Sequence, residues 1–398
     1  MSENICPNEP SRCGDQRSAM ELIERAIDGD AEAGRLLFPK IVEPLGDSFD
    51  PDLCNVYVGV FTCVFSRVLP ELQREDLIGR YERVRTPRPF AGSDPKRVFV
   101  LSRVTLGADI AVTSVILDAA KRRFPRADIF FAGPRRNYEL FAGDERIRHA
   151  EVPYPRGGSL HDRLAVWPQL ADALDQDDAL VIDPDSRLTQ LGLLPVCAED
   201  RYLFFESRAY GADTEEPLTA LTRRWVAETL GIEGARAWFC PADHPRERFD
   251  VTVNLGTGEN ADKRVADPFE TELLREIASR FPRVLVDSGH GGEEADRVRN
   301  AVREAGIDAE IFSGSFAAFA ARIAQSRLFV GYDSAGGHAA AAAGTPLVSV
   351  FAGYLCDRTF QRWRATGPAP AHVIRVDPSD TPESVLERVR EFLNSHTR

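Results

Sequence analysis

A short run of polar residues separates two apolar segments near the C-terminal end of the sequence. LFVGYD (328–333) leads into Ser-Ala-Gly-Gly-His (334–338), an alanine run and then PLVSVFA (346–352). The β-branched and aromatic residues predict buried strands, and the alanines predict a helix between them. The polar run therefore falls where a strand passes into a helix. Free N–H groups in a first helical turn, together with the helix dipole, suit an anion such as a diphosphate.

The residue types in this run fit a bound phosphate. Asp333 comes at the carboxyl end of its strand, the edge at which open α/β sheets bind ligands. Gly336 and Gly337 would let a ligand approach the backbone closely. A second interpretation stays open, in which Asp333 and Ser334 only cap the helix and His338 is an interior side chain.

Two further loops follow predicted strands in the same half of the chain. VNLGTGENADKR (253–264) carries Lys263, a suitable counter-charge for phosphate. VDSGHGGEE (286–294) ends in carboxylates suited to ribose hydroxyls. The candidate residues on the nucleoside side are Gly256, Thr257, Gly291 and Glu294.

Short strands alternating with helices must position these loops. The candidate strands are 98–102, 128–133, 149–154, 179–183 and 202–207, then 250–256, 283–289, 309–314, 328–333, 346–352 and 372–377. Such alternation predicts parallel sheets with right-handed crossovers. We expect an α/β fold with two Rossmann-like units facing each other across a cleft. Residues 1–92 predict a small helical N-terminal domain and linker, 93–245 the first unit, and 246–398 the second unit with a C-terminal helix.

Composition narrows the class of protein. The 398 residues carry a formal net charge of −13, which argues against a general nucleic-acid binder. The sequence begins with a polar segment and holds no apolar run of transmembrane length, although a peripheral membrane contact stays open. The seven cysteines are scattered without a CxxC pair, so we expect a cytoplasmic protein without a zinc site.

The order of these motifs over residues 97–380 resembles glycosyltransferase family 9, the ADP-heptose:lipopolysaccharide heptosyltransferase-like enzymes. The resemblance implies a GT-B fold, with a nucleotide sugar such as ADP-heptose as substrate and no cofactor. It also implies that Lys263 binds phosphate and that residues 333–336 form the diphosphate loop. His338 corresponds to the family's histidine at the start of that helix, and Glu294 to the acid that contacts the ribose side. The family usually has Asp-Ser-Gly or Asp-Thr-Gly where this chain has Asp333-Ser334-Ala335.

The first unit opens with a strand and the loop Thr-Leu-Gly-Ala-Asp (105–109). In the family, an aspartate after the glycine is the proposed general base, and here one extra residue separates Gly107 from Asp109. The resemblance implies that Asp109 lies at the cleft edge and accepts the proton of the acceptor hydroxyl. A plain helix cap is the alternative.

Other residues of the first unit are candidates for acceptor contacts. Asp183 ends a predicted strand and begins Asp-Pro-Asp, a triplet that also occurs in metal-binding glycosyltransferases; two Rossmann-like units do not suit that other architecture, so we expect no metal. Arg156 and Arg163 lie in a glycine-containing loop that fits either an anionic acceptor or a plain surface.

These observations predict an inverting, metal-independent glycosyltransferase that moves heptose or a similar sugar to a glycan or another acceptor. The altered loops at 105–109 and 333–338 leave a second hypothesis open, a non-catalytic nucleotide-sugar-binding or assembly protein with the same fold. A third is an epimerase-like enzyme that acts on the nucleotide sugar alone.

Overall fold

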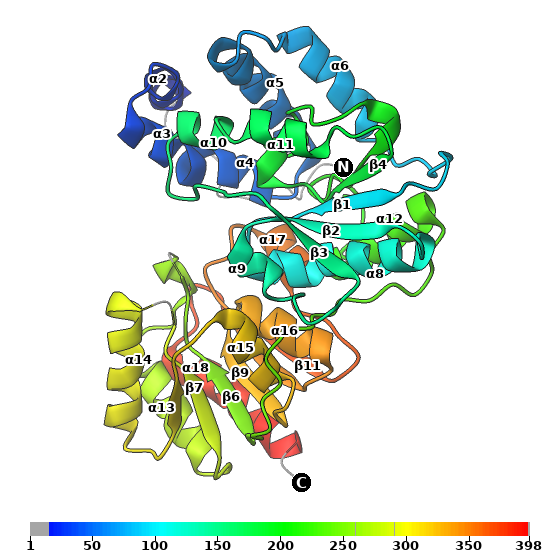
Figure 1. Cartoon of the computed structure of the whole chain (residues 1–398). Coiled ribbons are helices and arrows are strands. Elements are labelled where there is room, and N and C mark those ends of the chain that lie inside the picture. The colour runs from blue at the N-terminus through cyan, green and yellow to red at the C-terminus, as the bar shows by residue number, and fades with distance from the viewer. Residues whose placement is uncertain (1–15, 259, 290, 397–398) are drawn as a thin grey trace.

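The computed structural model describes residues 16–258, 260–289 and 291–396, and it contains two parallel sheets, one in each half (Figure 1). The first sheet consists of β1 (Arg97–Leu101), β2 (Asp128–Gly133), β3 (Ile147–Glu151), β4 (Ala179–Asp183) and β5 (Tyr202–Phe204). The second consists of β6 (Val251–Asn254), β7 (Val284–Asp287), β8 (Glu310–Phe312), β9 (Leu328–Tyr332), β10 (Leu347–Phe351) and β11 (Ala371–Arg375). Each of the predicted strands is present.

The two sheets have the same internal order. Their strands run β3-β2-β1-β4-β5 and β8-β7-β6-β9-β10-β11, with each neighbouring pair parallel. The direction of the chain across the sheet reverses beside β1 and β4 in the first sheet, and beside β6 and β9 in the second. Loops at the carboxyl ends of such strand pairs diverge and leave a crevice, the usual ligand site of a doubly wound sheet. The prediction of an α/β fold with two Rossmann-like units is confirmed.

Helices cover both faces of each sheet. The N-terminal region forms α2 (Gln16–Ile27), α3 (Ala31–Leu37), a π-helical segment Phe38–Val42, α4 (Glu43–Asp47), α5 (Pro51–Val68) and α6 (Arg74–Val84). The first unit adds α7 (Leu106–Ala108), a π-helical segment Asp109–Thr113, α8 (Ser114–Arg123), α9 (Arg135–Tyr138), α10 (Leu160–Leu164), α11 (Trp167–Leu174) and α12 (Leu218–Leu230). The second adds α13 (Phe269–Ala278), α14 (Gly292–Ala305), α15 (Phe316–Ile323), α16 (Ala335–Ala343), α17 (Asp357–Trp363) and α18 (Pro382–His396). Short 3-10 turns occupy Arg187–Thr189, Glu199–Arg201 and Ala261–Lys263.

The N-terminal helices share the core of the first sheet. Phe99, Leu101 and Val181 of that sheet lie in one apolar cluster with Phe61 and Tyr81 from α5 and α6. The opposite face of the same sheet packs against α8 and α12. Residues 16–84 therefore form a helical layer over the first sheet, in the region where the sequence predicts a small helical N-terminal domain.

The second sheet is covered by helices from its own half. One face packs against the alanines of α16 and against α15, and the other packs against α13, α14 and α18. The first unit's last helix, α12, ends at Leu230 and β6 begins at Val251, so the chain changes sheets in the stretch that contains the predicted boundary.

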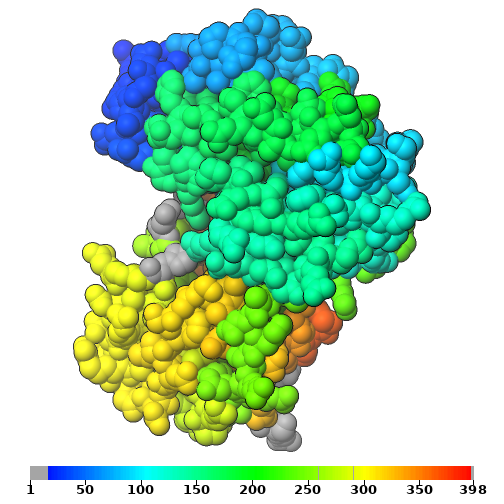
Figure 2. Space-filling model, viewed as in Figure 1, coloured from blue at the N-terminus to red at the C-terminus, as the bar shows by residue number. Residues whose placement is uncertain are grey.

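The N-terminal layer also contacts the second unit. The Thr359 hydroxyl in α17 donates to the carbonyl of Asp47 at 2.8 Å, and the Arg358 guanidinium donates to that of Phe49 at 2.8 Å. The Phe49 ring meets Trp363 edge-to-face. Figure 2 shows an indentation where the two halves of the molecule meet. Residues 47–49 thus connect the N-terminal layer to α17 of the second unit.

Candidate functional site

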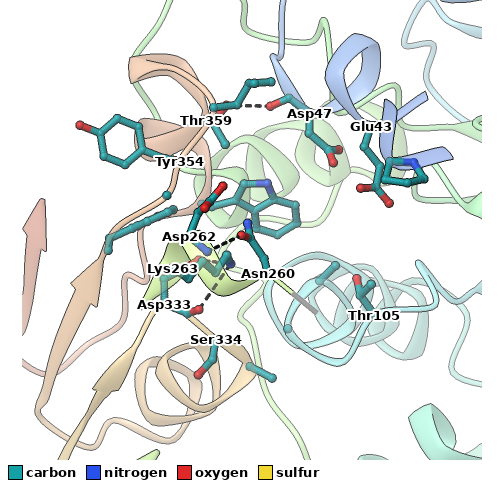
Figure 3. Close-up of a pocket in the computed structure, with 18 of the residues that line it drawn as sticks. Glu43, Asp47, Thr105, Asn260, Asp262, Lys263, Asp333, Ser334, Tyr354 and Thr359 are labelled. Carbon is teal, nitrogen blue, oxygen red and sulfur yellow. Dashed lines mark hydrogen bonds and ion pairs between the residues drawn. The ribbon is translucent and has the colours of Figure 1, made fainter. Parts of the chain in front are cut away.

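A cavity of about 520 Å³ lies between the two units, where the loops after β1, β6 and β9 converge. Three parts of the chain line it (Figure 3). The N-terminal layer contributes Pro39, Lys40, Glu43, Pro44 and Asp47; the first unit contributes Thr105, Gly107 and Ala108; the second contributes Asn260, Asp262, Lys263, Asp333, Ser334, Ala335, His338, Phe351, Gly353, Tyr354, Leu355, Thr359 and Trp363. The cavity lies in the crevice predicted between the two units, and the N-terminal layer gives it an additional wall.

Lys263 and the start of α16 form one side of the cavity. Strand β9 ends at Tyr332, so Asp333 and Ser334 lie at the carboxyl edge of the sheet. Ser334 is the N-cap of α16: its hydroxyl accepts from the N–H of Gly336 at 3.3 Å and donates to Asn254 at 3.2 Å. The Lys263 ammonium lies 2.7 Å from the Asp333 carboxylate. An ammonium and the N–H groups of a first helical turn thus meet at one place, as the sequence predicts.

The two adjacent glycines of α16 differ in how closely they are packed. A Cβ on Gly336 would lie 2.6 Å from the ring of Phe329, so this glycine lets α16 pack tightly on β9. Gly337 has room for a Cβ, which would be 3.7 Å from Ser349. Both glycines are buried and neither lines the cavity. Their predicted contact with a ligand stays a prediction.

His338 is an interior side chain that reaches the cavity. It is 8% exposed, and its ring meets Trp363 edge-to-face at 5.9 Å. Burial lowers the pKa of the imidazole, which favours its neutral form. Gly107 of the first unit packs directly above it, since a Cβ on Gly107 would lie 3.1 Å from His338 and 3.3 Å from Ala335. Gly107 therefore permits close contact between the two units.

The loop between β6 and α13 adds lining residues that the sequence analysis missed. Asn260 caps a short 3-10 turn by accepting from the N–H of Asp262 at 3.0 Å, and this turn delivers Lys263. A Cβ on Gly353, whose φ is +63°, would come within 2.5 Å of Asp262, so a glycine there lets the loop lie against the end of β10. The sequence shows a glycine, Gly353, directly after a predicted strand. It does not show that the loop containing Asp262 packs against this glycine.

The nucleoside-side residues lie outside the cavity lining. Glu294 accepts from the N–H groups of Thr257 and Gly258 at 2.9 and 3.0 Å. A Cβ on Gly256 would lie 3.0 Å from the same carboxylate. Gly291 has a φ of +94° at the start of α14. Glu294 thus organises the glycine loop, and its predicted contact with a ribose stays a prediction.

Asp109 does not lie at the cleft edge, which corrects the expectation from the resemblance. It is 0% exposed. One carboxylate oxygen accepts from the N–H of Arg103 and the Thr113 hydroxyl, both at 2.7 Å. The other accepts from the Ser102 hydroxyl at 2.7 Å and the Asn137 amide at 2.6 Å. The burial raises the pKa of Asp109, opposite to the lowering that the helix dipole alone predicts.

The extra residue in the 105–109 loop explains this position. Residues Asp109–Thr113 form a π-helical turn, in which the Ser114 N–H donates to the Asp109 carbonyl. A π turn accommodates one more residue than an α turn and rotates the side chains before it. Ala108 consequently lines the cavity, while Asp109 points into the interior.

The acceptor-side candidates are also placed elsewhere. Asp183 is buried and accepts from Ser186, Thr189 and Tyr202, and burial raises its pKa to about 6. The Arg163 guanidinium lies 3.5 Å from the centre of the Phe38 ring and donates to the Tyr154 hydroxyl at 2.7 Å. It therefore fastens its loop to the N-terminal layer. Arg156 is exposed and does not line the cavity. Of the predicted first-unit residues, Gly107 alone lines it.

The wall contributed by the N-terminal layer could not be read from the sequence. Glu43 and Asp47 lie one helical turn apart on α4, and both extend into the cavity (Figure 3). Asp47 lies 3.6 Å from Arg187, whereas Glu43 has no hydrogen bond or ion pair within the described part of the chain. Two carboxylates thus occupy the wall that faces Lys263 and Ser334.

Two features are absent from the described residues. These residues contain no group of three His, Cys, Asp or Glu side chains arranged to hold a metal ion. Over the same residues, no helix has the length and apolar character needed to cross a membrane.

Comparison with known proteins bears on the fold and on part of the sequence. Residues 288–378 match the model of glycosyltransferase family 9 (heptosyltransferase). The Escherichia coli heptosyltransferase WaaC, solved with ADP, is similar over 75% of this chain and 99% of its own, with 16% identity and a TM-score of 0.56. A family 9 glycosyltransferase from Veillonella parvula is similar over 77% and 99%, with 12% identity and a TM-score of 0.54. No curated protein sequence matches the chain.

The fold of these two structures is the GT-B fold that the resemblance implied, with two Rossmann-like units. The matched segment begins after β7, and it contains α14, the run 333–338 and the strands β9 to β11. Residues 288–378 are thus similar to glycosyltransferase family 9 (heptosyltransferase), and they lie within a GT-B fold.

Proposed function

We propose that this chain transfers a sugar from a nucleoside-diphosphate sugar to an acceptor hydroxyl, with inversion at the anomeric carbon and without a metal ion. The observation that carries the proposal is the meeting of Lys263, Asp333 and the first turn of α16 in the cavity between the two units. The donor's diphosphate lies there, against the Lys263 ammonium and the N–H groups at the start of α16.

The charges in the cavity support this assignment. When the anomeric C–O bond breaks, negative charge grows on the leaving diphosphate, and fixed donors at that position stabilise the transition state. Lys263 is one such donor, held in place by Asp333. A carboxylate beside a diphosphate would repel it, so Asp333 is suited to orienting Lys263 and accepting hydrogen bonds from sugar hydroxyls.

The donor and acceptor classes follow from the resemblance and from the related structures. The structure of WaaC holds ADP, and we propose an ADP-sugar, with ADP-heptose as the first candidate, as the donor of this chain. The acceptor is a glycan or another hydroxyl compound. The five described cysteines are free thiols, which suits a reaction in the reducing cytoplasm.

The test is release of the nucleoside diphosphate. Purified protein is incubated with ADP-heptose and a panel of other nucleotide sugars, with and without glycan acceptors, and the released diphosphate is measured. Lys263→Met serves as the control. Acceptor-dependent release by the wild type, reduced in the variant, supports the proposal. Conversion of the donor without any acceptor supports an epimerase-like enzyme instead.

A non-catalytic nucleotide-sugar binder is the second candidate. It is favoured by the burial of Asp109, which removes the expected base from the cavity. Under this alternative, ADP stabilises the protein against heat, yet no donor in the panel is turned over with any acceptor.

A further inference from the structure

We propose that Glu43 of the N-terminal layer is the general base of this chain, in the position where the resemblance implies an aspartate of the first unit. The inference rests on the proposed glycosyl transfer. Glu43 lines the same cavity as Lys263 and Ser334, but it comes from a helix that lies outside both Rossmann-like units.

The first unit offers no carboxylate to this cavity. Its lining residues are Thr105, Gly107 and Ala108. The nearest acid in sequence, Asp109, is buried, and both of its oxygens are already occupied by two donors each. Moving Asp109 into the cavity would leave those donors unpaired in the interior, which is costly. The base must therefore come from another part of the chain.

The direction of attack selects among the carboxylates that do line the cavity. In an inverting transfer the acceptor approaches opposite to the leaving diphosphate, so the base faces the wall that holds the diphosphate. Asp262 and Asp333 belong to the loops on the Lys263 side. Glu43 and Asp47 come from the opposite wall, and both side chains are directed into the cavity (Figure 3). Asp47 is engaged by Arg187 at 3.6 Å. Glu43 is left as the carboxylate available to an acceptor.

The surroundings of Glu43 suit proton transfer. Its side chain is exposed to the cavity that it lines. Partial desolvation by the surrounding wall and, next, the charge of Asp47 raise the pKa of Glu43, while Arg187, Arg156 and Arg163 act in the opposite direction. The ammonium of Lys40 lines the same wall. A carboxylate with a raised pKa binds a proton more readily and is a stronger base than a glutamate with an ordinary pKa.

The proposed step is balanced in atoms and charge. The acceptor oxygen forms a bond to the anomeric carbon as its proton passes to a carboxylate oxygen of Glu43. The bond between that carbon and the β-phosphate oxygen breaks, and the nucleoside diphosphate leaves with the electron pair beside Lys263. The proton on Glu43 then passes to solvent through the open side of the cavity.

The experiment compares Glu43→Gln with Glu32→Gln, the same change at an exposed position on α3. Acceptor-dependent release of ADP from ADP-heptose is measured together with thermal stabilisation by ADP. We expect Glu43→Gln to lower kcat by about 10²- to 10⁴-fold, the usual contribution of a general base, with stabilisation by ADP retained. Glu32→Gln retains kcat and stabilisation. Glu43→Asp is expected to restore part of the activity.

A pH profile separates a base from a merely structural residue. Asp47→Asn removes the negative charge that raises the pKa of Glu43, so that pKa falls and the acid limb of the kcat profile moves to lower pH. Glu43→Gln should lose that limb.

Each contrary result overturns the inference in a recognisable way. If the wild type releases ADP and Glu43→Gln retains kcat, Glu43 is not the base, although the proposed function stands. If Glu43→Gln also loses stabilisation by ADP, the residue is structural. If the wild type turns over no donor, both the proposed function and the base assignment fail.

Discussion

The ammonium of Lys263 lies 2.7 Å from the carboxylate of Asp333, so the loop after β6 is joined to the loop after β9 at the point where the strand order reverses. Both side chains are partly buried, at 28% and 10% exposure. A diphosphate that enters the cavity can take over the ammonium from Asp333. The pair therefore holds the lysine ready in the free protein.

Lys263→Met should weaken the binding of ADP. Loss of a charge-assisted hydrogen bond costs about 1.5–3 kcal/mol, which corresponds to a Kd higher by about 10- to 100-fold. Asp333→Asn is the matched variant: it removes a negative charge near the diphosphate, so ADP should bind as tightly as to the wild type or more tightly. Isothermal titration calorimetry with ADP measures both. Weaker binding in Asp333→Asn than in Lys263→Met would contradict this arrangement.

Gly107→Ala should reduce turnover by holding the two units apart. The added Cβ would meet His338 at 3.1 Å and the α16 backbone at Ala335 at 3.3 Å, and a packed helix cannot move aside as a flexible side chain does. We expect kcat/KM for the donor to fall severalfold. Gly157→Ala is the control, because a Cβ there has no neighbour within 4 Å. Equal rates for the two variants would show that the contact is unimportant.

Asp109→Ala should act mainly on stability. The substitution leaves four donors without their acceptor in the interior, and we expect the free energy of unfolding to fall by roughly 3–5 kcal/mol. Urea denaturation measures this value. Asp118→Ala, on the partly exposed side of α8, should cost much less. A fully stable Asp109→Ala protein that had lost only turnover would restore Asp109 as the candidate base.

Asp183 should make stability depend on pH. Burial raises its folded pKa to about 6, above the unfolded value, so between these values the folded state binds the additional proton. The free energy of unfolding therefore falls as pH rises from about 4 to 6. Relative to Asp183→Asn, which cannot ionise, the wild type should lose about 2 kcal/mol between pH 4 and pH 7. Parallel curves for the two proteins would refute this.

Thr359→Val should loosen the contact between the N-terminal layer and the second unit. It removes the hydrogen bond from the hydroxyl to the carbonyl of Asp47, worth about 1 kcal/mol. Hydrogen exchange in residues 47–50 should accelerate by about fivefold. Thr271→Val on α13, remote from this contact, should leave that exchange unchanged. Unaltered exchange in Thr359→Val would mean that the other contacts of the segment suffice.

The sequence predicted local features of this fold well. Each strand was a short β-branched or aromatic run, and the polar run after β9 gave both a strand end and a helix start. The N-cap function of Ser334 was the alternative interpretation of the polar run, and the placement of Lys263 and Asp333 at one edge followed from the rule that loops at the carboxyl edge of a parallel sheet converge. These features depend on periodicity and topology, which one sequence displays.

Features that depend on distant packing could not be predicted. The apolar spacing of α5 and α6 showed that one face is buried, but not that the first sheet is what covers it. The predicted position of Asp109 was wrong because a single extra residue can extend a loop or form a π turn. The amino-acid sequence alone does not distinguish these outcomes. Glu43 and Asp47 were missed because the sequence does not show that the N-terminal helices pack beside this cavity.

Binding of a diphosphate by Lys263 and the start of α16, in the cavity between the two units, can be observed directly. A crystal structure of the protein with ADP tests it most directly. We expect diphosphate oxygens within hydrogen-bond distance of the Lys263 ammonium and of the first N–H groups of α16. ADP bound elsewhere, or a diphosphate directed away from Lys263 in this cavity, would contradict it.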